Sequence, residues 1–135
     1  MLSLILAAAL APAPAADAKP VTAAYYYKVR WGFQQEFQDL FFKNHYPLLK
    51  AQKDRIRDVE VFKPTFHGDG RADWTFLVVI TFASEAAFRG VPGEEESLIQ
   101  KLYPDQERYK KEEQRRFELL DAHWDVPLDP IAPPQ

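Results

Sequence analysis

The chain has 135 residues, enough for one domain, and its composition is that of a globular protein, with 47% hydrophobic, 27% charged and 14% aromatic residues. Its formal net charge of −3 comes without a basic patch, which argues against a nucleic-acid partner. The absence of cysteine excludes disulfides, thiol catalysis and cysteine-ligated metals.

The N-terminal segment has the pattern of an export signal. From Leu2 to Leu10 the chain is apolar apart from Ser3, and the Ala- and Pro-rich stretch that follows offers several A-x-A cleavage sites. The apolar run is too short to span a bilayer, so no stable membrane span is expected, and no basic residue precedes it. We predict a signal peptide over residues 1–18 and a periplasmic or secreted protein; a disordered Ala/Pro tail is the alternative.

The first strand is predicted over residues 21–31. Its side chains alternate, with Tyr25, Tyr27 and Trp31 on one face and polar residues on the other. From residue 33 to residue 48 the apolar spacing becomes that of an amphipathic helix, which Pro47 kinks or divides.

Two further strands follow. Residues 58–66 alternate, and Pro64 indicates an edge strand; a glycine-rich turn leads to the next strand. Residues 73–82 are apolar on both faces, and Trp74 is predicted to share a face with the even-numbered apolar residues after it. Such a strand is buried on two sides, so we expect helices to cover one face of the sheet and a second copy of the chain to cover the other.

The rest of the chain alternates between helices and a last strand. Ser84 is predicted to cap a helix that Gly and Pro break at residues 90–93, and helical spacing resumes over residues 94–102. Residues 104–120 are predicted as a solvated, highly charged helix, and residues 122–126 as a short fourth strand.

The order β-α-β-β-α-β predicts an α+β, ferredoxin-like domain over residues 19–128. Its four-stranded antiparallel sheet would have the first and third strands at the centre. Residues 129–135 form a Pro-rich tail that suits neither helix nor strand.

Two segments carry a family resemblance. Residues 41–49, Phe-Phe-Lys-Asn-His-Tyr-Pro-Leu-Leu, resemble the first-helix segment of EthD-like proteins. Residues 74–82 with the helix start at 84–88 are similar to the third strand and following helix of the dimeric α/β-barrel superfamily, which includes antibiotic-biosynthesis-monooxygenase-like and muconolactone-isomerase-like proteins. The resemblance, over residues 21–127, implies two sheets packed face to face in a homodimer, with a cleft between sheet and helices in each subunit.

That superfamily contains cyclases, isomerases, cofactor-free oxygenases and haem degraders, and the fold does not choose among them. The haem-degrading branch of that superfamily is characterised by an Asn on strand one, a Trp on strand three and a His on the second helix. This chain lacks that Asn and that His, so haem degradation is not expected.

His45 is the candidate catalytic residue. It lies four residues after Phe41 on the apolar face of the first helix, so its imidazole is expected to face the cleft and to transfer a proton near neutral pH. The alternative is a half-buried histidine that bonds a backbone carbonyl beside Pro47.

Aromatic side chains are the candidate ligand-binding residues, because rings stack on a small apolar or aromatic ligand while hydroxyls orient it. They are Tyr25, Tyr27, Trp31, Tyr46 and Trp74. Core and dimer packing is the alternative for most of them.

No metal and no cofactor is expected. His67, Asp69 and Asp73 surround the glycine-rich turn, but their spacing matches no known metal cage, and no cofactor motif occurs. His123 and Asp125 share a face of the last strand, where they either set a histidine tautomer or are simply solvated.

Two functional hypotheses follow. One is an exported homodimer that binds a small apolar or aromatic ligand, without proven catalysis. The other is a cofactor-independent enzyme, an EthD-like cyclase, isomerase or monooxygenase, with His45 as general acid and base.

Overall fold

The computed structural model describes residues 18–65 and 74–134. Its strands are β1 (Val21–Val29), β2 (Ile56–Phe62), β3 (Phe76–Phe82) and β4 (Leu120–Leu128). Its helices are α1 (Gln34–Leu40), the π-helix η1 (Phe41–His45), α2 (Tyr46–Ala51), α3 (Glu85–Arg89), α4 (Glu94–Leu102) and α5 (Gln106–Glu118).

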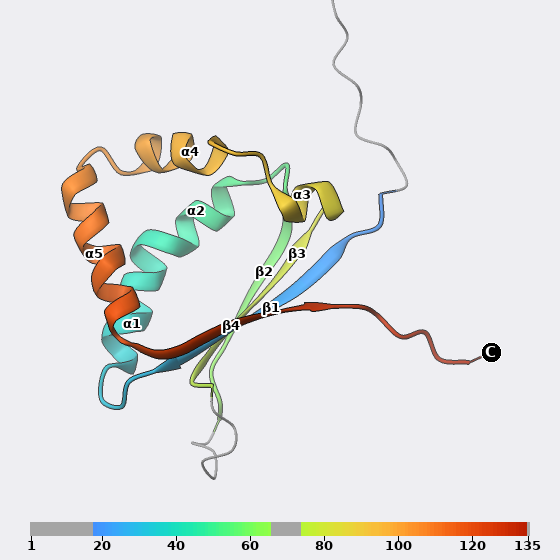
Figure 1. Cartoon of the computed structure of the whole chain (residues 1–135), viewed down its shortest axis with the longest axis horizontal. Helices are drawn as coiled ribbons and strands as arrows, with labels where there is room; N and C mark the ends of the chain where they lie inside the picture. Colours follow the sequence, from blue (N-terminus) through green and yellow to red (C-terminus); the bar gives the residue numbers. More distant parts are fainter. Residues whose placement is uncertain (1–17, 66–73, 135) are drawn as a thin grey trace, which may run out of the picture.

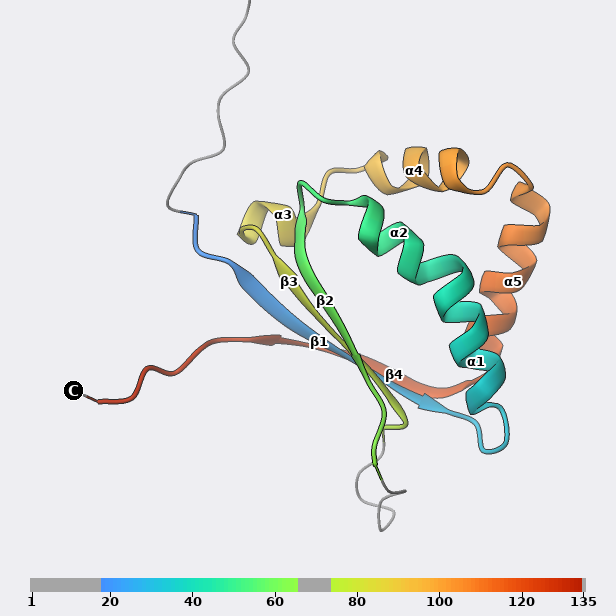
Figure 2. The same cartoon turned by 180° about the vertical axis from the view of Figure 1, so that it is seen from behind.

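The four strands form one antiparallel sheet in the order β2-β3-β1-β4. This is the predicted ferredoxin-like α+β fold, with β1 and β3 at the centre, and the prediction is confirmed. The helices of the described residues lie on one side of the sheet, and in both views the opposite side carries none of them (Figure 1 and Figure 2). Among the described residues, no helix is long and apolar enough to cross a membrane.

The core lies between the helices and the face of the sheet that they cover, here called the inner face. Alternate residues of β3 supply its floor, and they are almost fully buried: Phe76, Val78, Ile80 and Phe82. Phe37 of α1 and Phe41 of η1 pack onto this floor, with the Phe41 and Phe76 rings 4.9 Å apart. The helix spacing and the strand alternation thus meet in one aromatic core.

The opposite face of the sheet, here called the outer face, is also apolar. Because Tyr26 lies opposite both Leu77 and Trp124, these three side chains share it. The remaining large apolar members are Phe62, Val79, Val126 and Leu128. Phe62 and Leu128 are each 44% exposed, so no described residue covers the outer face at its two edges.

Trp74 belongs to the outer face, which corrects the prediction that it shares a face with Phe76. Its ring meets the Tyr26 ring edge-on at 6.1 Å. Regular pairing begins only at Phe76, because the Thr75 hydroxyl accepts the hydrogen bond of the Val29 N–H at 2.8 Å. The alternation of β3 therefore does not extend back to the tryptophan.

The first helical region is divided into three segments rather than kinked once. In η1 the Tyr46 N–H donates to the Phe41 carbonyl, five residues earlier. Pro47 has no N–H for the α-helical ladder, and its ring crowds the preceding turn, so a wider turn at this point relieves the clash.

Two strand ends differ from prediction. The first strand stops at Val29, and Trp31 lies in the following turn with 79% of its surface exposed; Gly32 supplies the positive φ of +87° that this turn requires. The last strand is longer than predicted and runs through Pro127. It is an edge strand, which needs ladder hydrogen bonds on one side only and so holds a proline.

Candidate functional site

A cavity of about 200 Å³ opens between the inner face of the sheet and α2, here called the inner cavity. Its apolar wall comes from β2, β3, α2 and α3, with Leu49, Ile56, Val78, Ile80, Phe82 and Phe88. Its polar lining consists of Tyr25, Tyr27, His45, Gln52, Arg55 and Glu95. The inner cavity therefore combines an apolar body with a few polar groups, as small-molecule sites do.

His45 enters the inner cavity from the π-helix η1. Its ring lies 5.5 Å from the Phe41 ring. The pKa of His45 is lowered from 6.5 to about 3, mainly by burial and in addition by the positive charges of Arg116 and His123. The imidazole is therefore neutral near pH 7, with one nitrogen that donates a hydrogen bond and one that accepts.

The two inner tyrosines of β1 keep their protons. Burial raises the pKa of Tyr25 to about 12, and the negative charge of Asp125 adds to this effect. Burial also raises the pKa of Tyr27 to about 12, against an opposing effect of Arg116. Both hydroxyls are consequently available as hydrogen-bond donors for a ligand at any physiological pH.

The predicted His123–Asp125 pair is formed on β4, beside Tyr27. The His123 Nε2 lies 3.2 Å from the Asp125 Oδ1, and its Nδ1 lies 2.8 Å from the Tyr26 carbonyl oxygen. Both neighbours are acceptors, so each of them accepts a hydrogen bond from the ring nitrogen that faces it when that nitrogen carries a proton. The ring stacks on Tyr27 at 4.2 Å, which ties this pair to the lining of the inner cavity.

Arg116 of α5 is buried, which corrects the prediction of a fully solvated charged helix. Only 1% of its surface is exposed, and Glu113 accepts two hydrogen bonds from it, at 3.0 and 2.7 Å. Its Nη1 has no partner. One sequence signal was present: Arg116 follows Tyr109 by seven residues, which places both on the same side of the helix.

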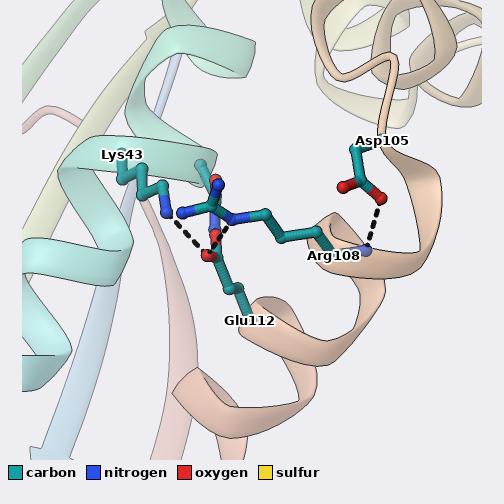
Figure 3. A network of polar contacts seen from close by, with 5 residues as sticks. Lys43, Asp105, Arg108 and Glu112 are labelled. Carbon is teal, nitrogen blue, oxygen red and sulfur yellow. Dashed lines mark hydrogen bonds and ion pairs between the residues drawn. The ribbon is translucent and has the colours of Figure 1, made fainter.

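A polar network fixes the π-helix to α5 (Figure 3). Glu112 accepts hydrogen bonds from Lys43 at 2.6 Å, Asn44 at 2.8 Å and Arg108 at 2.9 Å. The hydrogen bond from Lys43 is the largest of the effects that lower the pKa of Glu112 to about 2. Because Asn44 precedes His45 directly, this network holds the turn that directs the imidazole into the inner cavity.

Three of the predicted ligand-binding residues lie elsewhere. Trp31 is in the exposed turn after β1, and Trp74 packs against Tyr26 on the outer face. Tyr46 packs against Phe42, with 5.4 Å between the ring centroids, at the edge of the core. The inner cavity therefore brings together Tyr25, Tyr27 and His45 from the predicted set.

Gln52 and Arg55, at the end of α2 and in the turn before β2, were missed by sequence reasoning because no periodic pattern extends into that turn. His67, Asp69 and Asp73 lie outside the described residues. Within the described ranges, no three His, Asp or Glu side chains gather as a metal site would require.

No family model and no curated protein sequence matches this chain. Solved structures do match. A dimeric ferredoxin-like protein of unknown function from Thermobifida fusca is 12% identical with a TM-score of 0.53, covering 83% of this chain and 92% of its own. A candidate antibiotic biosynthesis monooxygenase from Bacteroides thetaiotaomicron is 9% identical with a TM-score of 0.53, covering 84% and 91%.

A third similar structure is that of a cofactor-independent oxygenase from Streptomyces nogalater, with 13% identity, a TM-score of 0.53 and coverage of 86% of this chain and 97% of its own. At such identities the likeness concerns the fold. The chain thus has the ferredoxin-like fold of antibiotic-biosynthesis-monooxygenase-like proteins, and the resemblance predicted from its sequence is confirmed at that level.

Proposed function

We propose that the protein is an exported homodimer that binds a small apolar or aromatic ligand in the inner cavity. The convergence of Tyr25, Tyr27 and His45 on one apolar-walled space of about 200 Å³ carries this proposal. An apolar cavity of about 150 Å³ holds benzene, so the inner cavity is of the size that a one-ring aromatic molecule needs.

In the inner cavity, the tyrosines and the histidine are suited to hydrogen bonds with a ligand rather than to ion pairs. Tyr25 and Tyr27 offer protonated hydroxyls, and the neutral His45 offers an acceptor that a phenol-like or alcohol-like ligand would use. A ligand with an aromatic body and one hydroxyl would satisfy both kinds of group.

Pairing through the outer face supports the homodimer. An apolar patch that spans all four strands is unusual on the surface of a soluble monomer. A second sheet packed face to face on it would bury Leu77, Val79 and Trp124 together. The Thermobifida fusca neighbour is described as dimeric. Export is supported by the signal-like pattern of residues 1–18, of which 1–17 lie outside the described part of the chain.

Binding of one-ring aromatics tests the proposal. Toluene, phenol and catechol would be titrated into isotope-labelled protein and followed by the NMR signals of Tyr25, Tyr27 and His45. In Tyr25→Phe the affinity for phenol is expected to fall roughly 2- to 10-fold, the effect of one neutral hydrogen bond, while toluene binding stays unchanged.

Tyr26→Phe is the matched control, because this neighbouring hydroxyl belongs to the outer face. Its phenol affinity should equal that of the wild type. If none of the three molecules causes saturable changes at these side chains, the protein is not a binder of small aromatics and the proposal is wrong.

A cofactor-independent enzyme is the second candidate, and the His123–Asp125 pair stacked on Tyr27 favours it. An imidazole and a carboxylate next to buried tyrosines form a route for a proton. With a pKa of about 3, His45 is a weak base in the empty site, and an anionic intermediate beside it would strengthen it. Oxygen uptake and NMR product analysis with phenol and catechol distinguish catalysis from binding.

A further inference from the structure

A second and larger cavity lies on the other side of Arg55 and Gln52. It measures about 540 Å³, and here it is called the outer cavity, although it lies among the helices and not on the outer face of the sheet. Its apolar lining includes Ala86, Ala87 and Leu98, from α3 and α4. Arg55 and Gln52 line both cavities, so a molecule that occupied the two spaces would pass these side chains.

The Arg55 side chain is fixed at this junction by neutral acceptors. Its Nε donates to the Ala87 carbonyl oxygen at 3.0 Å, and its Nη1 donates to the Gln52 Oε1. Its Nη2 lies next to Gly90, where a Cβ would come within 2.8 Å of it. The glycine therefore leaves the room that the guanidinium occupies.

Among the described arginines that are buried or half-buried, Arg55 is the one without a carboxylate partner; the exposed Arg57 has none either. Within the described residues, ion pairs join carboxylates to five arginines: Arg30, Arg89, Arg108, Arg115 and Arg116. Arg55 is half-buried, and its described contacts are with a carbonyl and an amide oxygen. A guanidinium has five N–H donors, so several remain for a ligand.

None of the described charged side chains that line the two cavities forms an ion pair with the guanidinium. Glu95 lines the inner cavity and Glu94 lines the outer one, both in the exposed first turn of α4, and Lys53 and Asp54 offset each other at the outer rim. The charge of Arg55 acts within the inner cavity, because it lowers the pKa of Tyr25, although burial raises that pKa more strongly. A half-buried cation without a counter-ion favours an anionic ligand.

We propose that Arg55 is the anion-binding residue of this site and that the ligand is an aromatic carboxylate, with its ring in the inner cavity and its carboxylate on the guanidinium. This inference rests on the proposed function and names the class of ligand. Gln52 holds the guanidinium in place, and the remaining N–H groups of Nη1 and Nη2 can donate to the two oxygens of one carboxylate.

A comparison of three ligands of similar shape tests it. Toluene, benzamide and benzoate would be titrated into the full-length protein, with chemical shifts of Tyr25 and Phe88 as the readout. The wild type is expected to bind benzoate at least about tenfold more tightly than benzamide, the effect of a charge-assisted hydrogen bond. Arg55→Gln should abolish that preference and keep toluene binding.

Arg57→Gln is the control, because Arg57 is an exposed arginine outside both cavities, and it should keep the preference for benzoate. Equal losses of toluene and benzoate binding in Arg55→Gln would show a merely structural arginine. Equal binding of benzoate and benzamide by the wild type would overturn the inference while the proposed function stands. No binding of any of the three would reject both.

Gly90→Ala tests the same geometry without touching the arginine. The new Cβ would displace the guanidinium, so benzoate should lose its advantage over benzamide while toluene still binds. Gly93→Ala is the control for an alanine at positive φ, because its φ is +85° and nothing lies within 4 Å of its Cβ. The backbone strain is larger at Gly90, where ψ is 175° rather than the −14° of Gly93, so the ratio of benzoate to benzamide affinity is the quantity compared. Retention of the benzoate preference in Gly90→Ala would contradict the assignment.

Discussion

The neutral His45 shows how one buried side chain couples the inner cavity to stability. Nothing in its own environment favours the charged ring: it is buried among aromatic rings, and two nearby groups carry positive charge. This environment keeps the imidazole neutral and able to hydrogen-bond to a ligand. It also means that protonation of His45 lowers the free energy of unfolding.

In His45→Asn, the free energy of unfolding is therefore expected to fall less steeply with decreasing pH than in the wild type, which flattens the acid side of the stability profile. In the unfolded chain the imidazole has a pKa near 6.5, whereas in the folded protein the pKa is about 3, so the unfolded state binds the extra proton as the pH falls from 6.5 to 3. The wild type should lose stability over that window, and the variant should lose less. Urea unfolding at intervals between pH 7 and pH 4 measures the difference.

His67→Asn is the control for the loss of one imidazole elsewhere in the chain, whereas His123 is unsuitable because it itself lowers the pKa of His45. If His67→Asn flattens the profile as much as His45→Asn does, the buried histidine is not the cause. For the enzyme candidate, His45→Ala should abolish any turnover and leave the midpoint of thermal unfolding within a few degrees. A collapsed fold in that variant would mark His45 as structural.

At the scale of elements, the π-helix is the unit that the sequence could not specify in full. The chain order and the alternation of β1 and β3 predicted the sheet, since a period of two is a strong signal. The π-turn depends on Pro47 and also on the hydrogen bond from Asn44 to Glu112 of α5, which is a tertiary contact. Arg55 and Arg116 escaped prediction for the same reason, since long-range packing alone decides whether a charged side chain is buried.

Glu112→Gln should loosen η1 from α5. The amide retains one oxygen for three donors and loses the charge that strengthens those hydrogen bonds, so the free energy of unfolding should fall by about 1–2 kcal/mol. Because the pKa of Glu112 is lowered to about 2, its stabilising effect is fully present above pH 4.5 and is lost as the pH falls toward 2.

Chemical unfolding at pH 7 and at pH 3 measures this effect, which should shrink at the lower pH. Glu107→Gln on the exposed side of α5 is the control and should be nearly neutral. A loss for Glu107→Gln as large as that for Glu112→Gln would attribute the change to the general charge of the helix.

At the scale of the whole molecule, the sheet has two apolar faces and one layer of helices. The strand alternation alone predicted this imbalance, and the structure places Phe62, Trp124 and Leu128 at the surface on the side without helices. A second subunit would turn two open-faced layers into one four-layer arrangement of helices, sheet, sheet and helices.

Val79→Lys tests that arrangement at the centre of the outer face. A lysine there must either be desolvated or break the pairing, so the Kd of the dimer should rise at least about 100-fold. Sedimentation at micromolar concentration would then show a single subunit. Val91→Lys is the control, because Val91 is 57% exposed in the loop between α3 and α4 and should leave the dimer intact. A wild type that sediments as one subunit would contradict the homodimer.

The three consecutive tyrosines of β1 carry a last consequence. Tyr25 and Tyr27 line the inner cavity, and Tyr26, between them, belongs to the surface where the second subunit would sit. A slide or twist of this one strand displaces both surfaces at once. Occupancy of the interior and association of the subunits would then be thermodynamically linked, each tightening or weakening the other by the same factor.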